Sequence, residues 1–389
     1  MKILMVIPAL GPIYGGTTKS VIELAEALGN LGVNVDIVAT NANGSTQLDV
    51  PTLSWITNKY YRIKYFPYWD FLDYKISLSL TRWLFQHVTN YELVHTNAIF
   101  SYPVLPAHWA CQLYQIPYIM TPHGMLEPWA LAYKASKKRF YFSLLEKPSL
   151  QRASAIQMLA STEANRLKAL KLKAPLIVIP NGIYQKDLKV LPEPELFYRE
   201  FPHTRNKTLL LFLGRIDPKK GLDLLATAFA QAQQQFPEIH LIIAGPDNIG
   251  FLPTAQNYFS TAGCSDAVTF TGMLTGEIKY AALAAANIYV APSYSEGFSI
   301  SVLEGMAAGL PCVITTGCNF PEAAAAEVAS VVDINADQIA NALIDLLKQP
   351  LQAKEMGDRA RQFILENYTW DSVAAKMLSV YQDIITLGK

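Results

Sequence analysis

The stretch KILMVIPALGPIYGGTTKSVIELAEALGNLGVNVDIVATN, residues 2–41, decides the fold. An apolar run, KILMVIPAL, is followed by a glycine loop, an amphipathic segment and a second apolar run, VNVDIVATN. Short apolar runs between turn residues are typical of buried strands, whereas apolar residues at helical spacing are typical of a packed helix. The order strand, helix, strand therefore predicts a parallel sheet flanked by helices.

The same rhythm continues along the chain and lapses once, between residues 184 and 207, where prolines and charged residues gather. It resumes with TLLLFLGRI and runs to PCVITT. At 389 residues the chain is too long for one typical core. We predict two doubly wound α/β domains, with the boundary at residue 184, and a cleft between them where loops from both sheets meet.

Composition narrows the class of protein. Lysine plus arginine and aspartate plus glutamate both number 32, so no overall field attracts nucleic acid. The opening apolar run lacks a cleavage site, and no later run approaches the ~20 residues of a membrane span. The four cysteines have no CxxC spacing and lie in apolar surroundings, which predicts reduced core residues in a cytoplasmic protein.

Two cations follow the first strand of the second half. In LGRIDPKKG, Arg215 and Lys220 lie five positions apart in a loop where ligands of such sheets bind. Arginine supplies a bidentate fork and lysine a compact charge, a combination suited to a diphosphate. The alternative is an exposed basic turn without a ligand.

Two glutamates lie eight positions apart in SYSEGFSISVLEG, residues 293–305. We expect a helix to begin near Phe298 or Ser299, with free amide groups that suit a phosphate. Glu296 could equally be an acid that suits the helix dipole. Glu304 falls among apolar residues two turns later, so its carboxylate needs a partner, and a pair of sugar hydroxyls would serve.

The first half offers a glycine loop and a histidine. Gly15 and Gly16 precede a helix that we expect Thr17 or Thr18 to cap, but the loop is not GxGxxG, which disfavours a dehydrogenase. His123 follows a predicted strand in TPHGM, where a structural role is the alternative to a catalytic one. Neither DxD nor HExxH occurs, so the sequence predicts no metal.

Two stretches, 55–74 and 131–147, mix aromatic and basic residues. Such a mixture indicates packing within the domain, contact with a membrane surface or lipid-linked substrate, or nucleic acid binding. The balanced charge argues against nucleic acid. Packing and peripheral membrane contact stay open.

In their order and spacing, these motifs resemble the retaining glycosyltransferases of family four, which have the GT-B fold. The resemblance rests on GR followed by lysine, on HG, on EGFSISVLE as E-x7-E, and on the glycine loop, and it covers nearly the whole chain. It implies that the last helix returns to the first domain. The predicted domains are then 1–183 plus 370–389, and 184–369. Tyr184 and Gly305 depart from the family's usual aspartate and alanine.

The resemblance also implies a role for each candidate residue. Arg215, Lys220, Gly15, Gly16, Phe298 and Ser299 would bind the donor diphosphate. Glu296, Gly297, Phe298, Ser299 and His123 would surround the donor sugar, and catalysis would fall to His123, Glu296, Arg215 and Lys220. The nucleoside would meet Glu304, Gly272, Met273 and Ile300.

We therefore predict a metal-independent, cofactor-free, retaining hexosyltransferase. The expected donor is a nucleotide sugar, with UDP-glucose as the first choice, and the acceptor is a saccharide or lipid-linked saccharide of envelope or exopolysaccharide biosynthesis. The expected location is the cytoplasm or the inner face of the membrane. The alternatives are a sugar-nucleotide epimerase of the same fold and a non-catalytic protein that binds sugar nucleotides.

Overall fold

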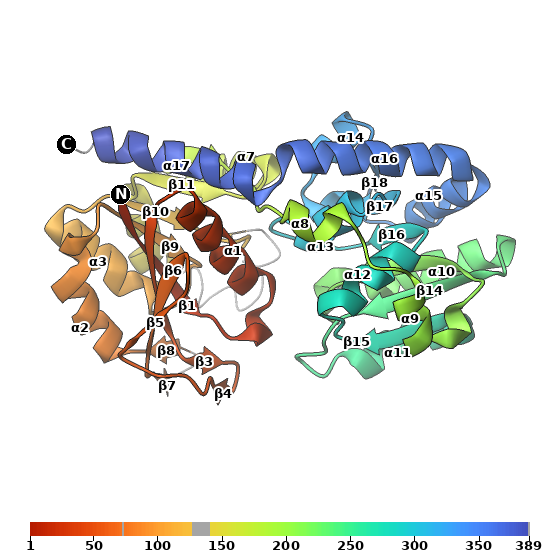
Figure 1. Cartoon of the computed structure of the whole chain (residues 1–389), viewed down its shortest axis with the longest axis horizontal. Helices are drawn as coiled ribbons and strands as arrows, with labels where there is room; N and C mark the ends of the chain where they lie inside the picture. Colours follow the sequence, from red (N-terminus) through yellow and green to blue (C-terminus); the bar gives the residue numbers. More distant parts are fainter. Residues whose placement is uncertain (72–73, 127–140, 388–389) are drawn as a thin grey trace. The chain divides into compact units, whose positions relative to one another are not determined.

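The computed structural model describes residues 1–71, 74–126 and 141–387, and it divides the chain into two compact units (Figure 1). Unit 1 comprises Met1–Gly182 and Trp370–Lys389, and unit 2 comprises Ile183–Thr369. The division falls one residue before the predicted boundary at 184. Each unit is built on a sheet of mainly parallel strands, so the predicted fold class is confirmed.

Unit 1 contains an eight-stranded sheet. Its strands in spatial order are β12 (Leu176–Val178), β11 (Ala155–Met158), β10 (Tyr118–Thr121), β9 (Leu93–Asn97), β1 (Lys2–Ala9), β2 (Asn34–Thr40), β6 (Tyr61–Phe66) and β5 (Trp55–Thr57). All neighbours pair in parallel except β5, which runs antiparallel to β6 at the edge. Two small hairpins join β3 (Ala42–Asn43) to β4 (Thr46–Gln47) and β7 (Trp69–Phe71) to β8 (Tyr74–Ile76).

Helices cover both faces of this sheet (Figure 1). They are α1 (Gly16–Asn30), α2 (Leu78–His87), α3 (Val104–Tyr114), α6 (Lys147–Arg152), α7 (Ser161–Leu167) and α17 (Trp370–Leu387). Side chains of alternate strand residues, among them Leu4 and Val6, join the core beneath α2 and α3. The last helix, α17, packs against α1, where the indole of Trp370 donates to Glu23 at 2.8 Å.

A buried polar chain ties α17 to the sheet. The hydroxyl of Thr121 donates to Gln157, so it accepts from Nε2 of His95 at 2.6 Å. The other ring nitrogen of His95 then accepts from the hydroxyl of Tyr381 on α17, also at 2.6 Å. Burial, with a smaller effect of His123, lowers the pKa of His95 from 6.5 to about 3, and the histidine is neutral.

Asp36 lies in the middle of β2 and is fully buried. The guanidinium of Arg62 on the neighbouring strand β6 donates hydrogen bonds to both carboxylate oxygens, at 2.8 and 2.6 Å. The Tyr91 hydroxyl donates a further hydrogen bond at 2.8 Å. This carboxylate therefore stabilises the pairing of β2 and β6 and is not the acid of a dinucleotide fingerprint.

Unit 2 contains a six-stranded parallel sheet. Its strands in spatial order are β15 (Val268–Gly272), β14 (Ile239–Ala244), β13 (Thr208–Leu213), β16 (Ile288–Ala291), β17 (Cys312–Thr315) and β18 (Ser330–Val332). The helices are α8 (Gln185–Lys189), α9 (Glu195–Glu200), α10 (Leu222–Gln235), α11 (Leu252–Thr261), α12 (Gly276–Ala285), α13 (Ile300–Ala307), α14 (Pro321–Ala325), α15 (Ala336–Lys348) and α16 (Pro350–Asn367). The core on one face joins β13 and β14 to α10, α11 and α15.

Gly305 has a packing reason to differ from alanine. The buried ring of Tyr289 on β16 lies against this turn of α13, and a Cβ at position 305 would approach the ring carbons to 2.6 and 2.7 Å. Carbon atoms do not pack at that separation, so a side chain here would displace the ring. The departure from the family's alanine thus accompanies a tyrosine on the facing strand.

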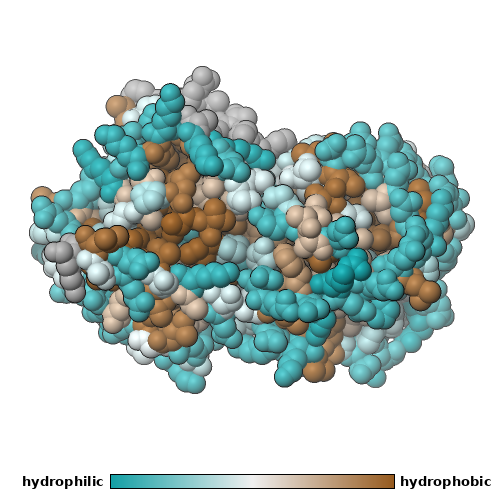
Figure 2. Space-filling model, turned by 90° about the horizontal axis from the view of Figure 1, so that it is seen from above, coloured by the Kyte–Doolittle hydropathy of each residue, from teal (hydrophilic) through white to brown (hydrophobic). Residues whose placement is uncertain are grey.

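The aromatic stretch 55–74 is largely accounted for by packing. Tyr65, Phe66 and Tyr68 are buried, and Trp55 packs edge-on against Trp83 of α2 with ring centroids 5.9 Å apart. Trp69 differs, because 61% of it is exposed. Figure 2 shows that hydrophobic residues reach the surface in separate areas bordered by hydrophilic ones. Of the stretch 131–147, residues 131–140 lie outside the described residues.

Within the described ranges, no helix combines the length and hydrophobicity that a membrane crossing requires. The four cysteines are buried and unpaired, as predicted. Burial raises the pKa of each thiol. These thiols are core residues of their units.

Protonation of His95 should destabilise unit 1. Because its pKa is lower in the folded chain than in the unfolded one, the unfolded state binds the proton first as the pH falls below about 6.5. From about pH 7.5 to about pH 5 this histidine alone should cost ~2 kcal/mol of unfolding free energy. Chemical denaturation at both pH values should show a smaller loss in His95→Gln. Equal losses in both proteins would contradict this origin.

The contact between Gly305 and Tyr289 predicts an overpacking penalty. Gly305→Ala should lower the free energy of unfolding by about 1–3 kcal/mol, because the methyl group meets the ring. In a Tyr289→Leu background the same substitution should cost clearly less, since the smaller side chain leaves room. A double-mutant cycle measured by chemical denaturation gives the coupling. Additive effects would show that the contact does not limit residue 305.

Candidate functional site

The loop after β13 carries the predicted cations. Asp217 caps a short 3-10 helix, Pro218–Lys220, by accepting from the amide of Lys219 at 3.0 Å. Gly221 then adopts a φ of 69°, and a Cβ there would lie 2.0 Å from the carbonyl oxygen of Pro292. Only glycine permits so close an approach in this conformation. The loop is thereby pressed against the segment that follows β16, which contains Glu296.

Lys220 and Glu296 form a buried ion pair. Each residue is only 9% exposed, and the ammonium group contacts Oε1 of the carboxylate. Ser293 donates to the same oxygen at 2.8 Å. The backbone of Glu296 is fixed as well, because its amide donates to Gly317 at 2.8 Å and its carbonyl accepts from the side chain of Asn319. The sequence predicted both charged residues but not their pairing.

Electrostatics keep Glu296 ionised. Burial alone would raise the pKa of its carboxyl group, but the charges of Lys220 and Lys219, together with hydrogen bonds from Lys220 and Ser293, outweigh burial and lower it. The group is therefore a carboxylate at neutral pH. It can accept hydrogen bonds from a ligand's hydroxyl groups but cannot donate a proton to a leaving group.

Positive charge exceeds negative charge in this loop. Arg215 is half-buried, and within the described part of the chain its guanidinium forms no hydrogen bond or ion pair. Lys219, which the sequence analysis did not select, lies beside it, and burial lowers the pKa of its amine. Three cations thus stand against the carboxylates of Asp217 and Glu296. This excess of positive charge favours an anionic ligand.

The helix α13 begins at Ile300, one or two residues later than predicted. Ser299 precedes it without capping it, because its hydroxyl lies 3.1 Å from that of Ser301. The amides of the first turn therefore lack a side-chain acceptor, which is the arrangement that favours a bound anion. Phe298 contributes backbone only, since its ring packs edge-on against Phe320 at 5.1 Å.

Glu304 has a protein partner that the sequence did not predict. The carboxylate, on the second turn of α13, is 5% exposed, and Nζ of Lys279 on α12 lies 3.0 Å from Oε1. Gly272, which ends β15, and the exposed Met273 come shortly before α12 in the chain. No motif marks Lys279, because it is separated from Glu304 by 25 positions and meets it only in the folded unit.

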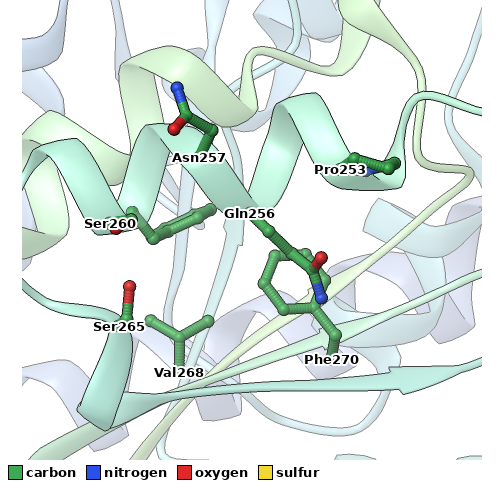
Figure 3. Close-up of a pocket in the computed structure, with 8 residues that line it drawn as sticks. Pro253, Gln256, Asn257, Ser260, Ser265, Val268 and Phe270 are labelled. Carbon is green, nitrogen blue, oxygen red and sulfur yellow. The ribbon is translucent and has the colours of Figure 1, made fainter.

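A pocket in unit 2 lies away from these residues. It has a volume of about 430 Å³ between α11 and β15, and Figure 3 shows side chains from both elements around it. Pro253, Gln256, Asn257, Phe259, Ser260, Ser265, Val268 and Phe270 line it. None of the predicted site residues is among them.

In unit 1, the backbone at the predicted glycine loop is open. Helix α1 begins at Gly16, so the prediction that Thr17 or Thr18 caps it was wrong. Gly15 precedes the helix with a φ of 61°. A Cβ at either glycine would find nothing within 4 Å. Among the described residues, nothing therefore crowds the Cα atoms of these two glycines.

His123 adopts a φ of 52° two residues after β10. Its Nε2 donates to the amide oxygen of Asn97, the last residue of β9, at 2.9 Å. Nδ1 is then the acceptor nitrogen of the ring. Burial lowers the pKa of His123 to about 4, so the ring is neutral at physiological pH. The next amide, of Gly124, donates to the buried Glu163 at 3.2 Å.

The described residues contain no group of three or more histidine, cysteine, aspartate or glutamate side chains placed to hold a metal ion. The charged groups of the site are instead distributed by unit. Arg215, Lys220, Glu296 and Glu304 lie at the carboxyl ends of strands in unit 2, whereas Gly15, Gly16 and His123 lie at those of unit 1.

Known proteins resemble both units. The family model "Glycosyltransferase Family 4" matches residues 14–185, and "Glycosyl transferases group 1" matches residues 196–363. A phosphatidyl-myo-inositol mannosyltransferase of Mycobacterium leprae is 25% identical over 399 residues, which span 100% of this chain and 98% of the relative. A GDP-mannose-dependent alpha-(1-6)-phosphatidylinositol monomannoside mannosyltransferase of Mycolicibacterium smegmatis is 28% identical over 225 residues, 56% of this chain and 58% of the relative.

Solved structures share the whole fold. A sucrose-phosphate synthase from Thermosynechococcus elongatus has a TM-score of 0.80 with 22% identity, covering 100% of both chains. Anabaena HepE, solved in complex with UDP and glucose, has a TM-score of 0.78 with 17% identity, covering 98% of this chain and 100% of that one. The solved structures show that the chain has the GT-B fold, and the two family models show that it belongs to the family 4 glycosyltransferases.

Proposed function

We propose that this glycosyltransferase moves a hexose from a nucleoside diphosphate sugar to a saccharide or lipid-linked acceptor, with retention of configuration and without a metal ion. The observation that carries the proposal is the buried pair of Lys220 and Glu296, next to Arg215 and the uncapped start of α13. This arrangement supplies positive charge for a diphosphate and a fixed carboxylate for a sugar.

The cations would act on the leaving group. When the bond between sugar and phosphate breaks, negative charge develops on the departing diphosphate oxygen. Lys220 is held by its ion pair and the amides of Ser299 and Ile300 are held by the start of α13, so together with Arg215 they would stabilise this charge. Because these groups can neutralise the diphosphate, the proposal requires no divalent cation.

Glu296 and His123 would serve the sugar. Glu296 is ionised, and its position is fixed through Ser293 and Asn319, so it can hold the sugar hydroxyls in one orientation. His123 is neutral and presents Nδ1 as an acceptor, which suits a hydroxyl or a developing positive charge at the reacting carbon. Retention would follow if the acceptor attacks from the face that the diphosphate leaves. No protein nucleophile is assigned.

The donor expected from the sequence needs revision. UDP and glucose are the ligands of one solved structure that shares the fold, whereas one of the sequence relatives is named as GDP-mannose-dependent. We place GDP-mannose first. The relatives' names also include phosphatidylinositol lipids, which supports a lipid-linked acceptor and peripheral contact at the cytoplasmic membrane face. The relatives are transferases, which favours this reading over an epimerase.

A panel of donors tests the reaction. With GDP-mannose, UDP-glucose, UDP-galactose and UDP-N-acetylglucosamine supplied separately, we expect slow release of free nucleoside diphosphate, fastest with GDP-mannose. The release should persist in EDTA, because neutralisation rests on protein groups. A coupled assay for GDP and UDP measures it. Interconversion of sugars without release would identify an epimerase, and binding without release a non-catalytic protein.

The diphosphate assignment predicts the effect of removing Arg215. Arg215→Ala should lower kcat/KM about 10²- to 10³-fold, because one fixed donor to the developing charge is lost. The folded state should be little affected, since this guanidinium forms no ion pair within the described chain. Steady-state kinetics and thermal unfolding measure the two effects. Lys220→Ala should lose activity similarly but also lose stability, because Glu296 remains buried without its partner.

The matched control is Lys354→Ala. Lys354 forms an exposed ion pair with Asp358 on α16, at 2.7 Å. The substitution therefore removes a lysine of unit 2 that is not among the site residues. Its activity should match that of the unaltered chain. Near-normal turnover in Arg215→Ala would remove this residue from the phosphate site.

A further inference from the structure

The pairing of Lys279 with Glu304 assigns a residue that no motif identified. Its Nζ lies 3.0 Å from the carboxylate, and the side chains of the lysine and the glutamate are 18% and 7% exposed. Removing two charges this far from water is costly, and the contact between them offsets the cost only when the geometry is good. Each charge therefore fixes the other in place.

Lys279 also occupies a defined place relative to the sheet. Strand β15 ends at Gly272, and α12 begins at Gly276, so Lys279 lies in the first turn of the helix that follows this strand end. Glu304 lies on α13, which follows β16 (Figure 1). Ligands of parallel sheets bind at these carboxyl ends. The ion pair thus joins the two segments expected to surround the nucleoside.

The chemistry of the pair matches a vicinal diol. A carboxylate has two oxygens with about four acceptor sites, and Lys279 uses one of them. An ammonium group has three N–H donors, and one points at Glu304. A ribose offers two neighbouring hydroxyls, each of which donates and accepts. Glutamate can accept from the diol while lysine donates to it.

We propose that Lys279 is a nucleoside-binding residue, which positions the carboxylate of Glu304 and donates to the same ribose hydroxyls. This inference rests on the proposed function, because it requires a nucleoside diphosphate in unit 2. It adds a second, cationic half to the ribose site that the sequence assigned to Glu304 alone. Lys279 then contributes to donor affinity and to discrimination against deoxyribose.

Affinity for product nucleotides tests the inference without an acceptor. Isothermal titration of the unaltered chain with GDP, UDP and their 2′-deoxy forms should show a preference for ribose of at least about 10-fold, the value of one hydrogen bond to a charged group. In Lys279→Met this preference should fall to about 3-fold or less, since the carboxylate loses its orientation and the diol loses a donor. Lys279→Arg should recover part of the preference.

Control variants separate binding from folding. Lys354→Met removes an exposed ion pair of the same unit and should leave the ribose preference unchanged. If Lys279→Met does not fold, the preference is read from Lys279→Gln, whose amide keeps a hydrogen bond to Glu304 without the charge. Thermal unfolding of each variant establishes which one is used.

Each outcome has a distinct meaning. If the unaltered chain prefers ribose and the Lys279 variants keep that preference while weakening all nucleotides alike, the lysine is structural and the inference fails alone. If the unaltered chain binds but does not prefer ribose, the diol site itself is refuted. If neither GDP nor UDP binds, the proposed function fails and the inference falls with it.

Discussion

Two carboxylates are buried at one edge of the unit-2 sheet, and burial of a charge requires a partner. Glu296 meets Lys220, and Glu304 meets Lys279. These two ion pairs join the segments after β13, β15 and β16, which are distant in sequence. Without the lysines, burial of the two carboxylate charges would be strongly unfavourable.

Backbone contacts support the same arrangement. Gly221 brings the loop of Lys220 against Pro292, and Gly305 lets α13 pack on the ring of Tyr289. The distance between cation and carboxylate is therefore set by the sheet and does not depend on flexible side chains alone. Such preorganisation is what stabilisation of developing charge requires, because donors that are already in place need not reorient during the reaction.

In unit 1, hydrogen bonds of neutral histidines hold the corresponding elements in place. Its last helix returns from the end of the chain and is anchored by a buried chain of hydrogen bonds through Tyr381, His95 and Thr121. His123 follows β10 and donates a hydrogen bond to Asn97 at the end of β9. Both histidines are neutral, so near neutral pH their contribution lies in hydrogen bonding and not in charge.

Much of this fold could be predicted from the sequence. Alternating apolar and amphipathic segments predict the parallel sheets that both units contain, and the lapse after residue 184 predicts a domain boundary there. The local motifs also selected Arg215, Lys220, Glu296 and Glu304 as candidates. The sequence did not predict which of these side chains contact one another. Lys279 on α12 contacts Glu304 on α13 only once the chain has folded. The absence of a side chain at Gly305 is explained by the ring of Tyr289, 16 positions earlier in the chain.

Local sequence preferences also failed to predict the N-cap of α1. Threonines after the glycine loop fit the preferences for helix starts, yet α1 begins earlier, at Gly16, because the loop itself turns at Gly15. The donor base remained open for a related reason. Gly272 and Met273 are expected to meet it through backbone atoms, which leave no side-chain pattern that separates guanine from uracil.

The central claim is that the cations of unit 2 bind the donor's diphosphate. A comparison of the affinities for a nucleoside diphosphate and a nucleoside monophosphate tests it most directly. Titration calorimetry of the unaltered chain should give a Kd for GDP at least about 10-fold tighter than that for GMP, with a difference that shrinks as salt rises. Equal affinities for GDP and GMP at low salt would contradict the account, because the second phosphate would then meet no cation.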